Sequence, residues 1–290
     1  IMDGTGHDIR QTDSKTQAKE VFEYDASTGH FRYAWNDLLE GLAQHRLVRT
    51  MVSTGFKSRY KGTLLGAFWL TATAGVTVLG LGVIYSQVFQ IDFRTYLPYV
   101  ALGMMIWGLI NGFVTESIST FSGMSSVFTQ IKIPMSVFPL TLTGRLMLTF
   151  FYRALVVVAI LLLGDRMITF VDIATSVMGV VIIAWAGFWT AILFGILGAR
   201  FRDFGQLINA FMTFAFFMTP VFWEASRLGQ FSFVAHANPL YHFLNIARGP
   251  LIGSSDVALS FLVAGAISVI LPMVALVMFA KFRHRIVYWC

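Results

Sequence analysis

Long uncharged stretches alternate with short charged segments along most of this chain. Five of these stretches contain no charge at all, and one more, 133–164, is interrupted only by Arg145 and Arg153. Because about 20 apolar residues are enough to cross a bilayer as a helix, the pattern predicts an all-α membrane protein with six transmembrane helices. The five stretches of twenty or more residues without a charge are 62–91, 95–115, 173–199, 204–223 and 257–280.

The residues before the first span divide into two parts. Residues 1–32 mix polar residues and glycine with few apolar positions, which is typical of a polar tail. Residues 33–62 carry apolar side chains at helical spacing, followed by a run of Arg and Lys. A basic amphipathic helix just before a span favours a position in the cytoplasmic membrane interface, although a soluble helix packed on a partner fits too. The remaining residues, 63–285, then form one transmembrane domain.

Two details refine these expectations. Asp37 and Glu40 have the three-residue spacing of a capping box at a helix start. Residues 224–256, between the fifth and sixth spans, contain a moderately apolar run too short to cross the membrane. We therefore expect a periplasmic re-entrant or interfacial segment there, shielded by protein or water.

Composition and charge agree with this interpretation and orient the chain. Hydrophobic residues make up 56% of the sequence, charged residues only 12%, and the net charge is +6. With the N-terminus inside, 15 of the 21 Lys and Arg residues fall on the cytoplasmic side. The positive-inside rule therefore predicts that both termini are cytoplasmic and that the basic excess faces the membrane surface, not nucleic acid.

Motifs for catalysis and metal binding are missing from the sequence. It contains no phosphate-binding loop and no zinc motif, and the first apolar run does not resemble a signal peptide. The single cysteine, Cys290, excludes a disulfide within the chain. We therefore expect no catalytic residue, no metal and no cofactor in this chain.

Ionisable residues inside the predicted spans are the strongest indication of function. Glu116 lies near the inner end of the second span, and Arg145 and Arg153 lie within the third. Such residues usually face a bundle interior or a watery path, although a purely structural ion pair explains Glu116 and Arg145 equally well. Trp107, deep in the second span, is a candidate to line a path for a sugar.

A series of short motifs resembles one family of membrane proteins. SRYKGTLLGAFW (58–69) is similar to the entry to the first span of ABC transporter permeases that export polysaccharides. Four further segments match the family in the same order. They correspond to its second span, its proline-terminated cytoplasmic coupling segment, its turn before span five and its outer re-entrant region. The matching segments are YLPYVALGMMIW (96–107), 126–134, RDFGQ (202–206) and ANPL (237–240).

The resemblance implies a permease of the O-antigen or lipopolysaccharide export type in the bacterial inner membrane. It implies a homodimer whose two copies form the channel, and two separate ATPase subunits that bind ATP and Mg²⁺. The substrate would be a glycan on a polyprenyl-pyrophosphate lipid carrier. Arg59 and Lys61, at the cytoplasmic mouth of the first span, join Arg145 as candidates to attract its phosphates.

The resemblance also suggests where the ATPase docks. A short amphipathic segment with Val127, Phe128 and Ile131 is the first candidate, and Trp35, Leu38 and Leu39 of the interface helix are the second group.

Three alternatives stay open from the sequence. A capsule or teichoic-acid exporter has the same architecture, and a drug exporter permease would carry small hydrophobic compounds. A membrane-embedded glycosyltransferase or ligase would need catalytic carboxylates in a large outer loop, but residues 224–256 carry acids only at their two ends.

Overall fold

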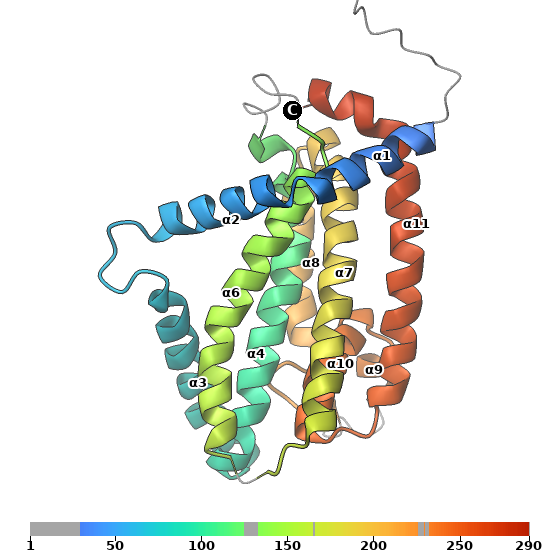
Figure 1. Cartoon of the computed structure of the whole chain (residues 1–290). Helices are drawn as coiled ribbons and strands as arrows, with labels where there is room; N and C mark the ends of the chain where they lie inside the picture. The colour runs from blue at the N-terminus through green and yellow to red at the C-terminus, as the bar shows by residue number, and fades with distance from the viewer. Residues whose placement is uncertain (1–29, 125–132, 165, 226–228, 230–231, 290) are drawn as a thin grey trace, which may run out of the picture.

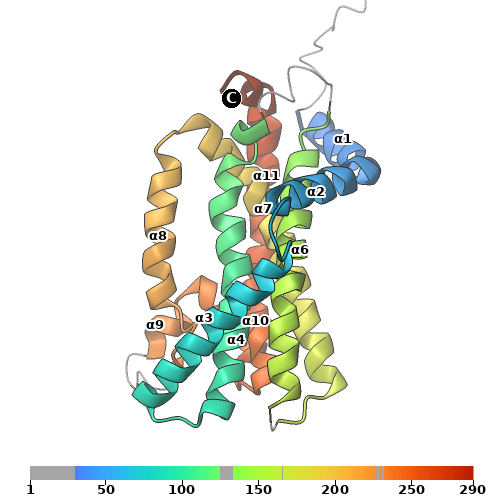
Figure 2. The same ribbon diagram turned by 90° about the vertical axis from the view of Figure 1, so that its left-hand side faces the viewer.

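The chain forms a bundle of long helices, with two helices lying across one end of it (Figures 1 and 2). The computed structural model describes residues 30–124, 133–164, 166–225, 229 and 232–289. Val127, Phe128 and Ile131 therefore lie outside the described residues. The helices in chain order are α1 (His30–Ala43), α2 (His45–Tyr60), α3 (Phe68–Phe89), α4 (Phe93–Glu116), η1 (Ser117–Ser119), η2 (Ser122–Met124), α6 (Val137–Leu162), α7 (Phe170–Arg200), α8 (Phe204–Met218), α9 (Ser232–His236), α10 (Pro239–Ile252) and α11 (Val257–Trp289).

Five of these helices, α3, α4, α6, α7 and α11, are long and apolar enough to cross a membrane. The sixth expected span is represented by α8, an apolar helix of only 15 residues. At 1.5 Å per residue it is about 22 Å long, shorter than the hydrocarbon core of about 30 Å. The chain is therefore a multi-pass membrane protein, with α8 standing alongside the long helices (Figure 2).

The centre of the bundle is formed by α4 and α7. Of the most apolar window of each helix, 56% is buried in α4 and 44% in α7, against 11% in α3. A helix that is apolar on all sides can lie at the centre of the bundle or at its periphery. Small residues then decide which neighbouring helices come into close contact. A Cβ on Gly187 of α7 would overlap the ring of Phe113 on α4, so glycine lets these two helices touch.

Helix α10 is packed inside the bundle, at the end opposite α1 and α2 (Figure 1). Every residue from 241 to 250 is buried. A Cβ on Gly179 of α7 would overlap the backbone carbonyl of Ile246, and Ser176 of α7 donates to the carbonyl of Ala247 at 2.6 Å. The moderately apolar run between spans five and six is thus part of the core and does not itself cross the bundle.

Side-chain caps fix where several helices begin. The Asp92 carboxylate accepts from the backbone N–H groups of Arg94 and Thr95, at 2.9 and 3.3 Å, and starts α4. Thr169 and Asp172 form a full capping box at the start of α7. The lengths of the uncharged stretches do not predict these two caps. Their side chains accept hydrogen bonds from backbone N–H groups that have no partner within the first turn of a helix.

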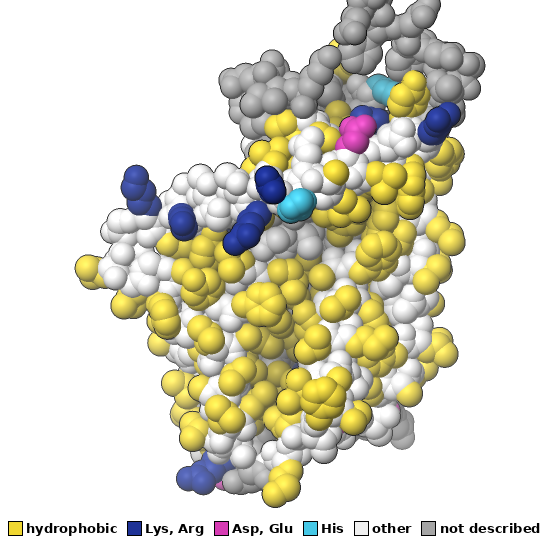
Figure 3. Space-filling view, in the orientation of Figure 1, with side chains coloured by type: hydrophobic (Ala, Val, Ile, Leu, Met, Phe, Trp, Pro, Cys, Tyr) yellow, Lys and Arg dark blue, Asp and Glu magenta, His cyan; other side chains and the backbone are white. Residues whose placement is uncertain are grey.

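The basic segment before the first span forms two helices instead of one. Helices α1 and α2 meet at Gln44, and α3 begins only at Phe68, six residues after the expected start of the first span. The connection contains Gly62 and Gly66, both with positive φ, which ends α2 before the membrane helix begins. Lys and Arg side chains gather along α2 above an uncharged apolar surface (Figure 3).

The predicted capping box at Asp37 and Glu40 is wrong. Asp37 lies in the middle of α1, and its side chain is fully buried. Its carboxylate accepts from the backbone N–H groups of Met135 and Ser136, at 3.1 and 2.9 Å, and pairs with Arg283 of α11 at 2.8 Å. Asp37 instead binds the two residues that immediately precede α6, nearly a hundred residues further along the chain.

After α8 the chain is unwound over residues 219–223, and side chains from other helices bind its carbonyl groups. Tyr96 donates to the carbonyl of Phe222, and Tyr99 donates to that of Trp223 at 2.6 Å. Arg248 of α10 donates to the carbonyl of Pro220 at 2.8 Å. Irregular backbone among membrane helices requires such partners, because lipid offers none.

The short α9 is tied to the start of α11 by a histidine–aspartate pair. His236 Nε2 lies 3.1 Å from an Asp256 carboxylate oxygen, and His236 Nδ1 lies 2.8 Å from the Ser232 carbonyl. The hydrogen bond to Asp256 raises the pKa of His236, and the same bond lowers the pKa of Asp256.

We expect Asp37→Ala to destabilise the protein by about 3 kcal/mol, because a buried, multiply bonded carboxylate is lost and two buried N–H groups lose their acceptor. Denaturant unfolding of the purified chain in detergent measures this. Glu40→Ala, at an exposed position of the same helix, is the matched control and should leave stability within about 0.5 kcal/mol. Equal stability of the two variants would show that the contacts of Asp37 with Met135, Ser136 and Arg283 do not contribute to stability.

The His236–Asp256 pair should make stability depend on pH. The stabilisation of the folded state by protonated His236 is fully present below the pKa of histidine in the unfolded chain, about 6.5. It is lost as pH rises through the raised pKa of His236 in the folded state. The stabilisation of the folded state by ionised Asp256 is present above about pH 3.8. It is lost as pH falls through the lowered pKa of Asp256 in the folded state. Thermal melting in detergent should therefore fall as pH increases from 6 to 8.5, and His236→Gln should flatten this slope. An unchanged slope would contradict the assignment.

Candidate functional site

An ion pair joins α4 and α6 near the end that carries α1 and α2. Arg145 Nη1 of α6 lies 2.7 Å from Glu116 Oε2, at the last residue of α4. The two side chains are 29% and 35% exposed, so they are shielded but not enclosed. The pairing expected from the sequence is therefore present, and it neutralises two charges that would be costly alone at membrane depth.

A second charged group, Arg153, lies in a cleft between α3, α4 and α6. The cleft has a volume of about 330 Å³ and is lined by Thr73, Thr77 and Trp107 among apolar residues. The Arg153 guanidinium packs against Gly108 of α4, where a Cβ would overlap it. No ion pair to another residue within the described ranges neutralises this cation.

A polar groove of about 400 Å³ runs between α4 and α8. Its α4 wall is a stripe four residues apart, formed by Trp107, Asn111 and Thr115. Its α8 wall carries Asn209 and Thr213, followed by two phenylalanines. Since Trp107 lines both the groove and the Arg153 cleft, the two hollows adjoin on α4.

The hydrogen-bonding state of the groove is uneven. The hydroxyl groups of Thr115 and Thr213 donate to carbonyls one turn earlier in their own helices, at 2.8 and 2.9 Å. The amide side chains of Asn111 and Asn209 make no hydrogen bond to another described residue. Amides at membrane depth need a partner, so the groove requires water, a second chain or a polar ligand.

The family model described as "ABC-2 type transporter" matches residues 46–252, most of the chain. The chain is a member of the ABC-2 type transporter family. It is the membrane permease component of such a transporter rather than an enzyme, as the sequence predicted, and membership implies an ATPase partner.

Two curated relatives of this ABC-2 transporter chain carry the same name. It is 22% identical to the O-antigen export system permease protein RfbA of Klebsiella pneumoniae over 244 residues, which is 82% of this chain and 93% of the relative. It is also 22% identical to the protein of that name from Myxococcus xanthus over 194 residues, covering 66% of this chain and 74% of the relative. The family predicted from short motifs is thereby confirmed.

The remaining candidates of this ABC-2 chain lie away from the groove. Arg59 and Lys61 are exposed at the end of α2 and in the connection to α3. On α1, Trp35 and Leu39 are about half exposed, whereas Leu38 is buried in the core with the end of α11. The structure thus leaves Trp35 and Leu39, but not Leu38, accessible to a partner.

Sequence reasoning missed the asparagines of the groove and the buried Arg248. Asn111 and Asn209 are uncharged and stand inside apolar runs, so a search for charges passes over them. Their helical spacing from Thr115 and Thr213 was the available signal. Within the described part of the chain, no group of three or more His, Cys, Asp or Glu side chains could hold a metal.

Replacing one member of the ion pair should be worse than replacing both. Arg145→Met or Glu116→Leu alone should each cost about 1.5–3 kcal/mol, because a charged hydrogen bond is lost and the partner is left unpaired. The double variant should recover most of that loss. A double-mutant cycle on unfolding in detergent tests this, and additive single effects would mean that the two charges do not interact.

Proposed function

We propose that this chain is the permease subunit of an ABC transporter that exports a lipid-linked polysaccharide such as O-antigen across the bacterial inner membrane. ATP hydrolysis occurs in a separate subunit, and two permeases and two ATPases make the transporter. The names of two relatives support the substrate class. The observation that carries the proposal is the groove whose two asparagine side chains make no hydrogen bond within the described part of the chain.

The distribution of charge supports an orientation with both termini in the cytoplasm. Basic side chains gather at the end that carries α1 and α2, and on the face seen in Figure 3 the middle of the molecule below them is uncharged. The positive-inside rule places that end in the cytoplasm. Residues 33–62 then form the interface segment, as two helices, residues 63–285 form the membrane domain, and residues 1–32 precede both.

In this orientation α8 serves as the fifth of six crossings. The helix is too short alone, and the unwound residues 219–223 supply the remaining length, at up to about 3.3 Å per residue. Their carbonyls are bound by Tyr96, Tyr99 and Arg248, which meets the requirement for irregular backbone inside a membrane. The buried α10 then forms the core of a periplasmic re-entrant segment.

The groove supports a dimeric channel. Asn209 and Thr213 are exposed on α8, and neighbouring α8 residues such as Phe211 and Phe214 are also exposed. A second copy facing α4 and α8 would enclose the groove and exclude lipid from its polar wall. The enclosed wall would offer amides for sugar hydroxyls and Trp107 for sugar C–H faces. A small hydrophobic cargo would leave the two amides unsatisfied, so the groove favours a glycan over a drug.

Charged groups would guide the phosphates of the lipid carrier. Arg59 and Lys61 lie at the cytoplasmic mouth, and Arg145 and Arg153 lie further along the bundle. Arginine is suited to this role because its planar fork matches two phosphate oxygens. Glu116 holds Arg145 while the path is empty. If Arg145 binds substrate, the Arg145→Met and Glu116→Leu double variant regains stability but not export.

The ATPase would dock at the cytoplasmic end. Val127, Phe128 and Ile131 remain the first candidates from the sequence, and the exposed Trp35 and Leu39 of α1 lie at the same end of the bundle. The buried Leu38 supports α1 from beneath. Apolar anchors at helical spacing are typical of a helix that enters a groove on a partner.

Replacing Asn111 and Asn209 with leucine should separate transport from folding. Removal of unpartnered amides should leave stability unchanged or raised, because no internal hydrogen bond is lost. Export of the glycan should fall by about tenfold or more, because the glycan loses its hydrogen bonds to the two amides. Each such bond contributes about 1–2 kcal/mol, and about 1.4 kcal/mol corresponds to a factor of ten. The measurement is surface polysaccharide in cells, together with membrane levels of the permease.

Asn111→Gln and Asn209→Gln are the matched controls, because they keep the amide and should keep most export. Val269→Leu, an apolar change at an exposed position of α11, should have little effect. Full export by the double leucine variant at normal membrane levels would refute the groove as the path.

A further inference from the structure

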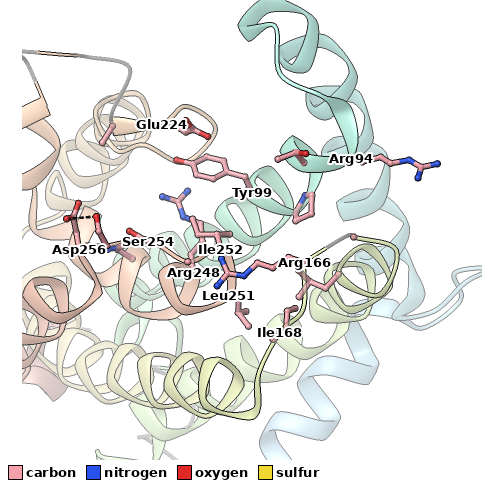
Figure 4. A pocket seen from close by; sticks show the side chains of 18 of the residues that line it. Arg94, Tyr99, Arg166, Ile168, Glu224, Arg248, Leu251, Ile252, Ser254 and Asp256 are labelled. Atoms are coloured by element: carbon pink, nitrogen blue, oxygen red, sulfur yellow. Dashed lines mark hydrogen bonds between the residues drawn. The ribbon is translucent and has the colours of Figure 1, made fainter.

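A cavity of about 590 Å³ lies at the end of the bundle opposite α1 and α2. Its walls come from the start of α4, from the α6–α7 connection and from α10, and the loop after α8 contributes Glu224. Figure 4 looks into this cavity. The groove and the Arg153 cleft are lined by other residues, so this is a separate hollow.

Arg248 is a cation built into the cavity wall. It is 2% exposed, and its guanidinium carbon lies 4.2 Å from the centre of the Tyr99 ring. Nη1 donates to the carbonyls of Pro220 and Val221, at 2.8 and 3.3 Å. Nε is buried and donates to no acceptor among the described residues. Holding the unwound stretch therefore uses one nitrogen and leaves a buried donor without a partner, which is costly unless a ligand binds it.

Arg166, from the α6–α7 connection, reaches the same cavity. Its Nη2 lies 3.4 Å from the carbonyl of Pro250, and its guanidinium packs against Gly253, where a Cβ would overlap it. Gly253 ends α10 with a φ of 75°, so glycine is favoured there by both conformation and space. Figure 4 shows Arg166 and Arg248 on the same side of the cavity, whereas the side chain of Arg94 points away from them.

Asp256, one of the acidic groups of the cavity, is already paired with a residue other than these two arginines. Asp256 is bonded to His236 at 3.1 Å. Glu224 stands across Tyr99 from Arg248 in Figure 4. An anion that enters the cavity would therefore meet two guanidinium groups, one of them shielded from water.

We propose that the cavity binds a phosphate-type headgroup, held between Arg166 and Arg248. Its volume lies in the range of small-molecule sites, about 300–1,000 Å³, and suits a diphosphate with an attached sugar. Arginine pairs recognise phosphate oxygens through charged hydrogen bonds that strengthen in a shielded site. Two sources share this chemistry, namely a polyprenyl diphosphate carrier, which rests on the proposed function, and the phosphate of a bilayer phospholipid.

Binding of defined anions to the full-length permease in nanodiscs of neutral phosphatidylcholine tests the site. The probes are farnesyl diphosphate and dioctanoyl phosphatidylglycerol, with sodium pyrophosphate as a competitor, and the readout is Kd by calorimetry. At least one lipid probe should bind, and pyrophosphate should compete with it. Arg166→Gln should weaken binding by about tenfold, and Arg248→Lys should weaken it by a similar factor.

Three controls keep the result interpretable. Arg166→Gln changes an exposed side chain, so it tests the site even if Arg248 variants fail to fold because Pro220 and Val221 lose their donor. Arg202→Gln removes the same charge at the opposite end of the bundle and should leave Kd unchanged. Arg94 also lines the cavity, but its side chain points away from the two arginines, so Arg94→Gln should weaken binding less than Arg166→Gln does.

The outcomes separate the claims. Tighter binding of farnesyl diphosphate identifies the carrier as the ligand, and tighter binding of phosphatidylglycerol identifies a bilayer lipid. Either result supports the site if Arg166→Gln weakens it. No binding of either probe, or equal binding by wild type, Arg166→Gln and Arg202→Gln, overturns the inference. The experiment needs neither ATP nor glycan, so its failure would leave the proposed export function standing, and failure of export would leave a phospholipid site standing.

Discussion

The five residues after α8 depend on a constraint that shapes the rest of the bundle, because carbonyl groups among membrane helices need donors from the protein itself. Tyr96 and Tyr99 of α4 and Arg248 of α10 provide them. This requirement explains why α10 is buried and why α4 is the most buried span. A helix of 15 residues can stand in the bundle only because three side chains from two other helices bind the backbone that follows it.

The sequence predicted the parts of the fold that depend on hydrophobic length. Five of the six expected spans form helices of sufficient length, and the tight turn between α7 and α8 lies where the basic residues placed it. The uncharged run did not predict the length of α8, because it continues to residue 223; Pro220 was the available signal for an earlier helix end. Nor could the sequence predict that Asp37 binds the residues before α6, since its spacing to Glu40 imitates a capping box and the true partners are distant in sequence.

The candidate site was predicted where charge marked it. Glu116 and Arg145 pair as the sequence suggested, and Arg153 and Trp107 line a common cleft. Uncharged amides left no comparable signal, so Asn111 and Asn209 emerge only when α4 and α8 are seen together. Arg248 was counted as a loop charge on the outer side, because its neighbours in sequence do not reveal that α10 is enclosed by α4, α7 and α11.

Charged and hydrogen-bonded contacts connect the two ends of the molecule through α6 and α4. Asp37 joins α1 and the end of α11 to the residues just before α6. Arg145 joins α6 to the end of α4 at Glu116, and α4 presents Trp107 and Asn111 to the groove before reaching Tyr99. Tyr99 binds the backbone that follows α8. Under the proposed coupling, an ATPase that moves α1 or the segment before α6 would therefore act on both walls of the groove, because α4 is bonded to α6 at one end and to the α8 extension at the other.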